Sequence, residues 1–133
     1  VLVFHGVDNL GYEALSHTTL DDYFQYIKNR QSEVWIATFG DVAKYMREKE
    51  HAKVEHIQKG DKIAISLNHT LDKAMYDMPL TLKTYVSPEW KRVWVWQGKR
   101  MQRVDAATDT KGTYVLYQAY PTGVPLTLSG KEN

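Results

Sequence analysis

The sequence predicts an α+β protein whose two halves follow different patterns. Over residues 1–50, apolar runs alternate with helical periodicities, whereas residues 52–133 show short alternating runs separated by Gly and Pro turns. The β-α-β-α order of the first half is typical of parallel strands joined by right-handed crossovers. The second pattern is typical of a small antiparallel β-sandwich. We therefore expect an α/β part over residues 1–51 and a sandwich over residues 52–133.

Two apolar runs in the first half, residues 1–4 and 34–39, are expected to be strands buried on both faces. The helix between them is expected to begin at Thr18 or Thr19, which can cap it. Its apolar face comprises Leu20, Tyr23, Phe24 and Ile27. A second helix is expected after Gly40. Its apolar face would carry Phe39, Val42, Ala43 and Met46, and its solvated face Lys44, Arg47, Glu48, Lys49 and Glu50.

The second half contains segments with the two-residue alternation of strands. The expected strands are residues 62–67, 80–86, 91–96, 101–104, 114–117 and 126–128. Gln97-Gly98-Lys99 is expected to be a hairpin turn, and residues 109–112 form a second turn signal. Connections this short favour antiparallel neighbours.

Composition limits the classes of function. The chain has 133 residues, 43% hydrophobic and 25% charged, which is enough for one good core or two small ones. No stretch approaches the roughly 20 apolar residues of a membrane span. The net charge of +1, with charges interspersed, argues against nucleic acid as a partner. Cysteine is absent, which excludes disulfides and thiolate chemistry but leaves the compartment open.

The chain starts inside a run that we expect to be a core strand. We therefore expect it to be the C-terminal part of a larger protein. Two parallel strands and two helices cannot cover both faces of a sheet. The missing neighbours could come from an absent N-terminal part, from a second copy of the chain in a homodimer, or from the second half.

Two stretches of the first half resemble the C-terminal end of the polysaccharide deacetylase family, also called the NodB-homology domain or carbohydrate esterase family 4. The first is Val1-Leu2-Val3-Phe4-His5-Gly6-Val7, which resembles the family's last motif, an apolar strand that ends in Leu-x-His. The second is Val34-Trp35-Ile36-Ala37-Thr38-Phe39-Gly40-Asp41-Val42-Ala43-Lys44-Tyr45-Met46, similar to the terminal strand and helix of a bacterial branch. The resemblance implies that residues 1–51 are the last units of a distorted (β/α) barrel.

The resemblance also implies an activity, the removal of acetyl groups from a polysaccharide by a metal-dependent hydrolase. His5 would then be the catalytic acid that protonates the leaving group. Val3, in place of the family's Leu, would line the acetyl pocket. The family's Thr-Phe-Asp-Asp and His-x-x-x-His motifs, which supply the base and the metal ligands, are absent. We thus expect no metal site in this chain, a divalent metal such as zinc in the complete enzyme, and no activity from the chain alone.

Further candidates come from the residues themselves. Asp8 and Tyr12 follow His5 in a loop and could line the same cleft. Trp90 follows Pro88-Glu89 and is the tryptophan we expect to be exposed and to contact a sugar. Trp94 and Trp96 share one side of a strand, where they could form a stacking platform, although a position in the packed interior is the simpler interpretation.

Two other functions remain open. The sandwich could be a non-catalytic carbohydrate-binding or accessory module, or a structural tail that only caps the barrel. Nine Tyr and four Trp residues suit sugar contact as well as a β-rich core. An acetylated polysaccharide is the expected partner, and a periplasmic or secreted location fits such a substrate.

Overall fold

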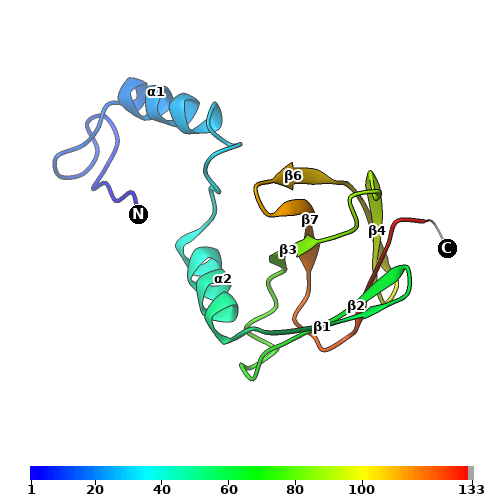
Figure 1. The fold of residues 1–133 in the computed structure, drawn as a ribbon. Helices are drawn as coiled ribbons and strands as arrows, with labels where there is room; N and C mark the ends of the chain where they lie inside the picture. Colours follow the sequence, from blue (N-terminus) through cyan, green and yellow to red (C-terminus); the bar gives the residue numbers. More distant parts are fainter. Residues whose placement is uncertain (132–133) are drawn as a thin grey trace. The chain divides into compact units, whose positions relative to one another are not determined.

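The computed structural model describes residues 1–131, in which two helices precede eight strands (Figure 1). The helices are α1 (His17–Lys28) and α2 (Phe39–His51). The strands are β1 (Lys53–Lys59), β2 (Lys62–Asn68), β3 (Leu80–Tyr85), β4 (Arg92–Gln97), β5 (Arg100–Asp105), β6 (Ala107–Asp109), β7 (Gly112–Ala119) and β8 (Leu126–Ser129).

The larger sheet has five antiparallel strands in the order β1-β2-β8-β4-β5. Its register places Val95 opposite Leu128, and Leu128 opposite Ile63. These three side chains are buried, so this face of the sheet points into the core. Because side chains alternate along a strand, Trp94 and Trp96 lie on the opposite, outer face.

The smaller sheet has the order β3-β7-β6 and faces the larger one. A single residue, Ala106, separates β5 from β6, so the chain passes directly from one sheet to the other. The side chain of Gln102 on β5 bonds the backbone N–H and C=O of Gln118 on β7 at 3.0 and 2.6 Å. Tyr117 points inward, where burial raises the pKa of its phenol to about 12.

The hydrophobic core lies between these two sheets. It is built from inward-facing side chains of five strands. All of these side chains are aliphatic except one tyrosine of β7. Its members are Ile63, Ile65, Leu67, Leu80, Val93, Val95, Val115, Tyr117, Ala119, Leu126 and Leu128. The strands expected from alternation are present, whereas β1 and the short β6 were not predicted.

Helix α2 packs against the segment that links β2 to β3. Its buried face carries Glu48, which is fully buried, whereas Phe39 and Met46 are 72% and 65% exposed. The prediction that Phe39 and Met46 are on the buried side and Glu48 on the solvated side is therefore wrong. The Glu48 carboxylate accepts a hydrogen bond from the backbone N–H of Met78 at 2.9 Å, and its other oxygen lies 3.6 Å from the buried His69 ring.

The chain divides into two compact units, residues 1–40 and residues from Asp41 onward. The first unit holds helix α1, which begins after Ser16 instead of the predicted Thr18 or Thr19. The Ser16 hydroxyl accepts from the backbone N–H of Thr19 at 3.1 Å. The boundary expected at residue 51 coincides with the end of α2, and the helix itself belongs almost wholly to the second unit.

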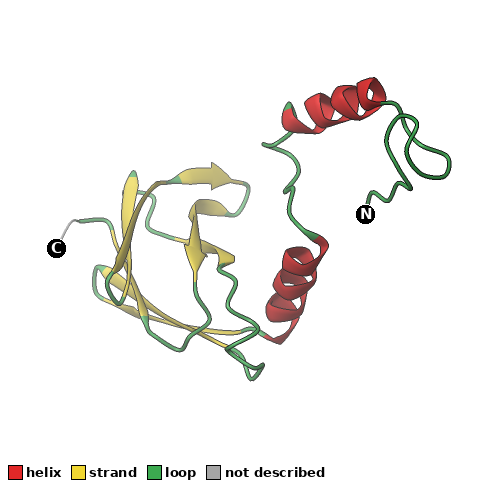
Figure 2. Cartoon of the chain, turned by 180° about the vertical axis from the view of Figure 1, so that it is seen from behind, coloured by secondary structure: helices red, strands yellow, loops and turns green. Residues whose placement is uncertain are grey.

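The prediction of barrel units over residues 1–51 is wrong. Residues 1–4 and 34–38 form no strand, and their side chains are exposed, from 41% at Phe4 to 99% at Val1. A strand needs a neighbour to bond its backbone groups, and residues 1–40 contain only a one-residue bridge, between Val7 and Leu15. The protein is mainly β, with two helices and two antiparallel sheets among its described residues (Figure 2).

None of the helices in the described part of the chain has the length and apolar character needed to cross a membrane.

Candidate functional site

Four of the predicted site residues lie in the first unit and are exposed, namely Val3, His5, Asp8 and Tyr12. The His5 ring meets the edge of the Tyr12 ring, with centroids 6.0 Å apart and an interplanar angle of 72°. Val3 is 76% exposed and Tyr12 is 70% exposed. The structure thus brings His5 and Tyr12 together, but it places neither in a buried pocket.

Asp8 belongs to the same loop and pairs with a residue that the sequence did not single out. Its carboxylate accepts from the backbone N–H of His17 at 2.9 Å and lies 3.0 Å from Nδ1 of the same residue. The backbone hydrogen bond is the main cause that lowers the pKa of Asp8, and the carboxylate in turn raises the pKa of His17. Asp8 adopts a left-handed backbone, with φ at 56°. This pairing joins the loop to the first residue of α1, and it does not by itself indicate a catalytic or binding role.

Trp90 is half-buried and packs against the core. Its ring covers Gly130 so closely that a Cβ there would lie 2.6 Å from the indole. The expected exposed aromatic residue is therefore built into the sandwich of the second unit, in contact with β8's end.

The outer face of the five-stranded sheet is the strongest candidate site. Here Trp94 and Trp96 are two positions apart on β4, so they lie about 7 Å from each other on the same side of the strand. Val93 and Val95 fill the core side of β4 with no exposure, whereas both indoles retain partial exposure. The two-residue spacing in the sequence placed Trp94 and Trp96 on one side of the strand, but it could not show which side of the strand faces the core.

The register extends this face across all five strands. The row through Trp96 comprises, in order across the sheet, Ile57, Ala64, Thr127, Trp96 and Met101. Its two ends are open to solvent, with Ile57 61% and Met101 52% exposed. The row through Trp94 comprises Lys59, Lys62, Ser129, Trp94 and Arg103. We call the outer side chains of these two rows the Trp face.

The outer face of the smaller sheet carries a different aromatic pair. Tyr85 and Tyr114 pack edge to face, and the Lys83 ammonium lies 3.8 Å from the centre of the Tyr114 ring. Asp109 accepts from Lys83 and, at 3.0 Å, from the Tyr85 hydroxyl. These contacts, led by the Lys83 hydrogen bond, lower the pKa of Asp109 to about 2. Because the polar groups of this cluster bond one another, the cluster is already satisfied without a ligand.

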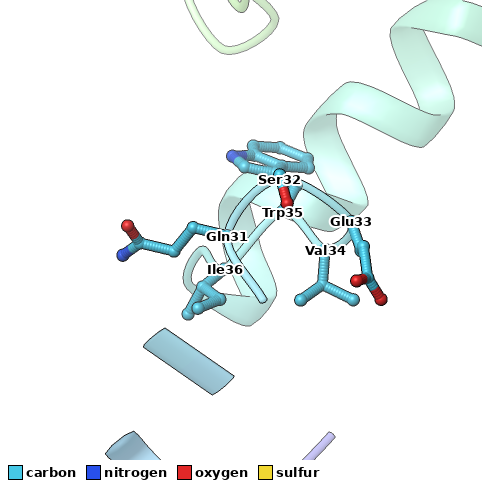
Figure 3. A pocket seen from close by; sticks show the side chains of 6 residues that line it. All are labelled: Gln31, Ser32, Glu33, Val34, Trp35 and Ile36. Atoms are coloured by element: carbon cyan, nitrogen blue, oxygen red, sulfur yellow. The ribbon is translucent and has the colours of Figure 1, made fainter. Parts of the chain in front are cut away.

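A shallow pocket of about 510 Å³ lies in the first unit and is lined by residues 31–36 alone (Figure 3). Figure 3 shows that the lining side chains come from one bend of the chain and not from converging elements. Its carboxylate, Glu33, is paired with Arg30 at 3.0 Å. The pocket therefore lacks the convergent polar groups of a binding site.

The described residues contain no cluster of three or more His, Asp or Glu side chains that could hold a metal ion.

The chain is similar to a gellan lyase from a Bacillus species. The two are 29% identical over 106 residues, which is 78% of this chain and 4% of that protein. The chain thus spans a small fraction of the length of the curated relative it matches. A match of this length extends well beyond residues 1–40 and into the sandwich. No protein-family model and no solved structure matches the chain.

These findings overturn the deacetylase interpretation. The similar protein is named a lyase and not a deacetylase, and the two motifs that carried the resemblance lie in segments that form no barrel strand. The predicted hydrolase activity is therefore unsupported, and the terms NodB and carbohydrate esterase do not describe this chain. The roles predicted for His5, Val3, Asp8, Tyr12 and Trp90 stay predictions without an activity to attach to.

Proposed function

We propose that the sandwich is a non-catalytic carbohydrate-binding module that holds a polysaccharide on the Trp face. The observation that carries the proposal is the pair of partly exposed indoles, Trp94 and Trp96, on the outer side of a strand whose inner side is core. Indole rings offer flat apolar surfaces to the C–H faces of sugar rings and a polar N–H at the edge.

Three further features support the proposal. The Trp face lies on a rigid sheet, so its two rings are held in place before a ligand arrives and less ordering entropy is lost on binding. The competing aromatic pair, Tyr85 and Tyr114, is engaged by Lys83. The similarity to a gellan lyase makes a polysaccharide the reasonable ligand class, and a secreted or extracellular location is compatible with it.

Affinity electrophoresis in gels that contain gellan, xylan or no polysaccharide tests the proposal. The protein should be retarded by at least one of the two polysaccharides. Trp94→Ala and Trp96→Ala should each weaken binding about tenfold, because aromatic anchors at an interface typically contribute more than 1 kcal/mol. Trp35→Ala, in the first unit, is the matched control and should bind like the unchanged protein.

Both indoles are partly buried, so each substitution should also lower the thermal unfolding midpoint, and circular dichroism checks that each variant is folded at the temperature of the gel. Unaltered mobility in both polysaccharides would refute the proposal. Retardation that both Trp94→Ala and Trp96→Ala leave intact would refute the Trp face as the site.

A further inference from the structure

A second pocket of about 510 Å³ lies at the end of β4, beyond Trp96. The β4–β5 turn and the loop between β7 and β8 line it. The lining residues are Gln97, Gly98, Lys99, Arg100, Thr122 and Val124. Unlike the pocket at residues 31–36, this one is built from two segments that are distant in the sequence.

The Gln97 side chain fixes the loop that forms one wall of the pocket. Its amide is 4% exposed and makes three hydrogen bonds. Nε2 donates to the carbonyls of Tyr120 and Val124 at 2.7 and 3.2 Å, and Oε1 accepts from the Tyr120 N–H at 2.9 Å. Because Gln97 is the last residue of β4, the loop is tied to the same strand that carries the Trp face.

The opposite wall carries two cations that have no anionic partner. Within residues 1–131, neither Lys99 nor Arg100 forms an ion pair, although Lys83, Arg92 and others do. The Arg100 guanidinium lies 4.3 Å from the centre of the Tyr120 ring. This stacking restrains the guanidinium while leaving its edge N–H groups able to donate. The residues that line the pocket include no acid.

The Trp face carries an unpaired cation of its own, but on the other side of the sheet from Arg100, because Arg100 is opposite Gln97 and shares the core side of the sheet with it. Arg103 is directly opposite Trp94, is exposed, and forms no ion pair among the described residues. A sugar chain that lies on Trp94 and Trp96 would pass beside Arg103, and it would have to bend around the β4–β5 turn, where Lys99 lies, to reach the pocket. Carboxylates are the groups that a restrained guanidinium and an ammonium bind best in such a chain.

We propose that this pocket binds the carboxylate of an acidic sugar residue, so that the module selects anionic over neutral polysaccharides. The inference rests on the proposed carbohydrate-binding function and adds the chemical class of the ligand. Arg100 supplies directional N–H donors, Lys99 adds a mobile charge, and Gln97 keeps the opposite wall in place.

Calorimetric titration of the whole chain with an oligogalacturonate and with its methyl ester tests the inference, because the two ligands share one sugar chain and differ only in whether the carboxyl groups are free or esterified. The acid should bind about tenfold more tightly than the ester at low salt, since each exposed charge pair contributes up to about fivefold. The difference should shrink as ionic strength rises, because salt screens exposed charges. Inorganic sulfate alone should compete weakly, and competition as strong as that of the oligosaccharide acid would indicate a simple anion site and overturn the sugar assignment.

Lys99→Gln should reduce the preference for the acid about fivefold without affecting the ester. Lys99→Glu should abolish the preference, and Lys111→Gln, at the β6–β7 turn of the other sheet, should leave it unchanged. Lys99 is exposed at a turn, so these variants should keep the unfolding midpoint of the unchanged protein.

The outcomes separate the two proposals. Equal binding of acid and ester overturns the carboxylate pocket and leaves the carbohydrate-binding function standing. A preference for the acid that is lost in Lys99→Glu, together with affinities for acid and ester that Trp94→Ala and Trp96→Ala leave unchanged, supports the pocket and refutes the Trp face. Absence of binding to either oligosaccharide or to any polysaccharide in the gels refutes both.

Discussion

Residues 1–40 and the sandwich place similar apolar residues in opposite environments. Val3 and Trp35, each within an apolar run, are 76% and 55% exposed, and Leu20 is the only buried apolar residue in residues 1–40. In the sandwich, Val95 and Leu128 are fully buried and pair across neighbouring strands.

The difference shows that apolar content does not make a buried strand. Backbone N–H and C=O groups must be bonded before a run can be buried, and in a strand only a neighbouring strand provides enough partners. Residues 62–67 find such neighbours in β1 and β8, whereas residues 1–4 and 34–38 find none within residues 1–40.

The largest expected effect compares a leucine from each region. Leu67→Ala removes a fully buried side chain and should lower the free energy of unfolding of the sandwich by about 3–4 kcal/mol. Leu2→Ala, at a position that is 48% exposed, should change it by less than about 0.5 kcal/mol. Urea unfolding followed by Trp fluorescence measures both. Similar losses in the two variants would contradict the contrast between the regions.

The next prediction has a smaller expected effect and tests where the sandwich begins. Helix α2 follows the exposed run at residues 34–38 but packs with the sandwich. Glu48→Ala removes the acceptor for the Met78 N–H and leaves it buried and unbonded, which should cost about 2 kcal/mol. Glu50→Ala, on the exposed side of the same helix, should cost less than about 0.5 kcal/mol. Equal effects in urea unfolding would show that α2 is not part of the folded sandwich.

The smallest expected effect is on the pH dependence of stability. It compares one carboxylate from each region, Asp109 and Asp8. The pKa of Asp109 is lowered from 3.8 to about 2 by Lys83, so its stabilising contribution is complete above about pH 4 and is lost as the pH falls through 2. Asp109→Asn should therefore flatten the acid end of the stability profile of the sandwich. Asp8, whose pKa is also lowered, lies in the other unit, and Asp8→Asn should leave that profile unchanged. Carbon-detected NMR titration of the two carboxylates checks the direction of both shifts.

The sequence predicted most strands of the sandwich because they are defined locally. Alternation and the turns at 97–99 and 109–112 located β4, β5 and β7 closely. Strand β1 was missed because all of its residues are exposed, so burial leaves no alternating pattern in Lys53–Lys59. It is recognised only through its pairing with β2.

The sequence likewise predicted only part of the candidate site. Period-two spacing placed Trp94 and Trp96 together, but Val93 and Val95 form an equally apolar opposite side. The choice between the two sides required the pairing with Leu128, which locates the core. The pocket at the end of β4 gave no sequence signal, since Gln97 and Tyr120 are 23 residues apart and meet only through the fold.

Local pattern sets the turns, the alternation of the sandwich strands and the helical segments, because these depend on neighbours within a few residues. Tertiary structure decided which apolar runs became strands, which side of β4 faces the core, and that Glu48 is buried. Each of these depends on hydrogen-bonding and packing partners that lie far away in the chain.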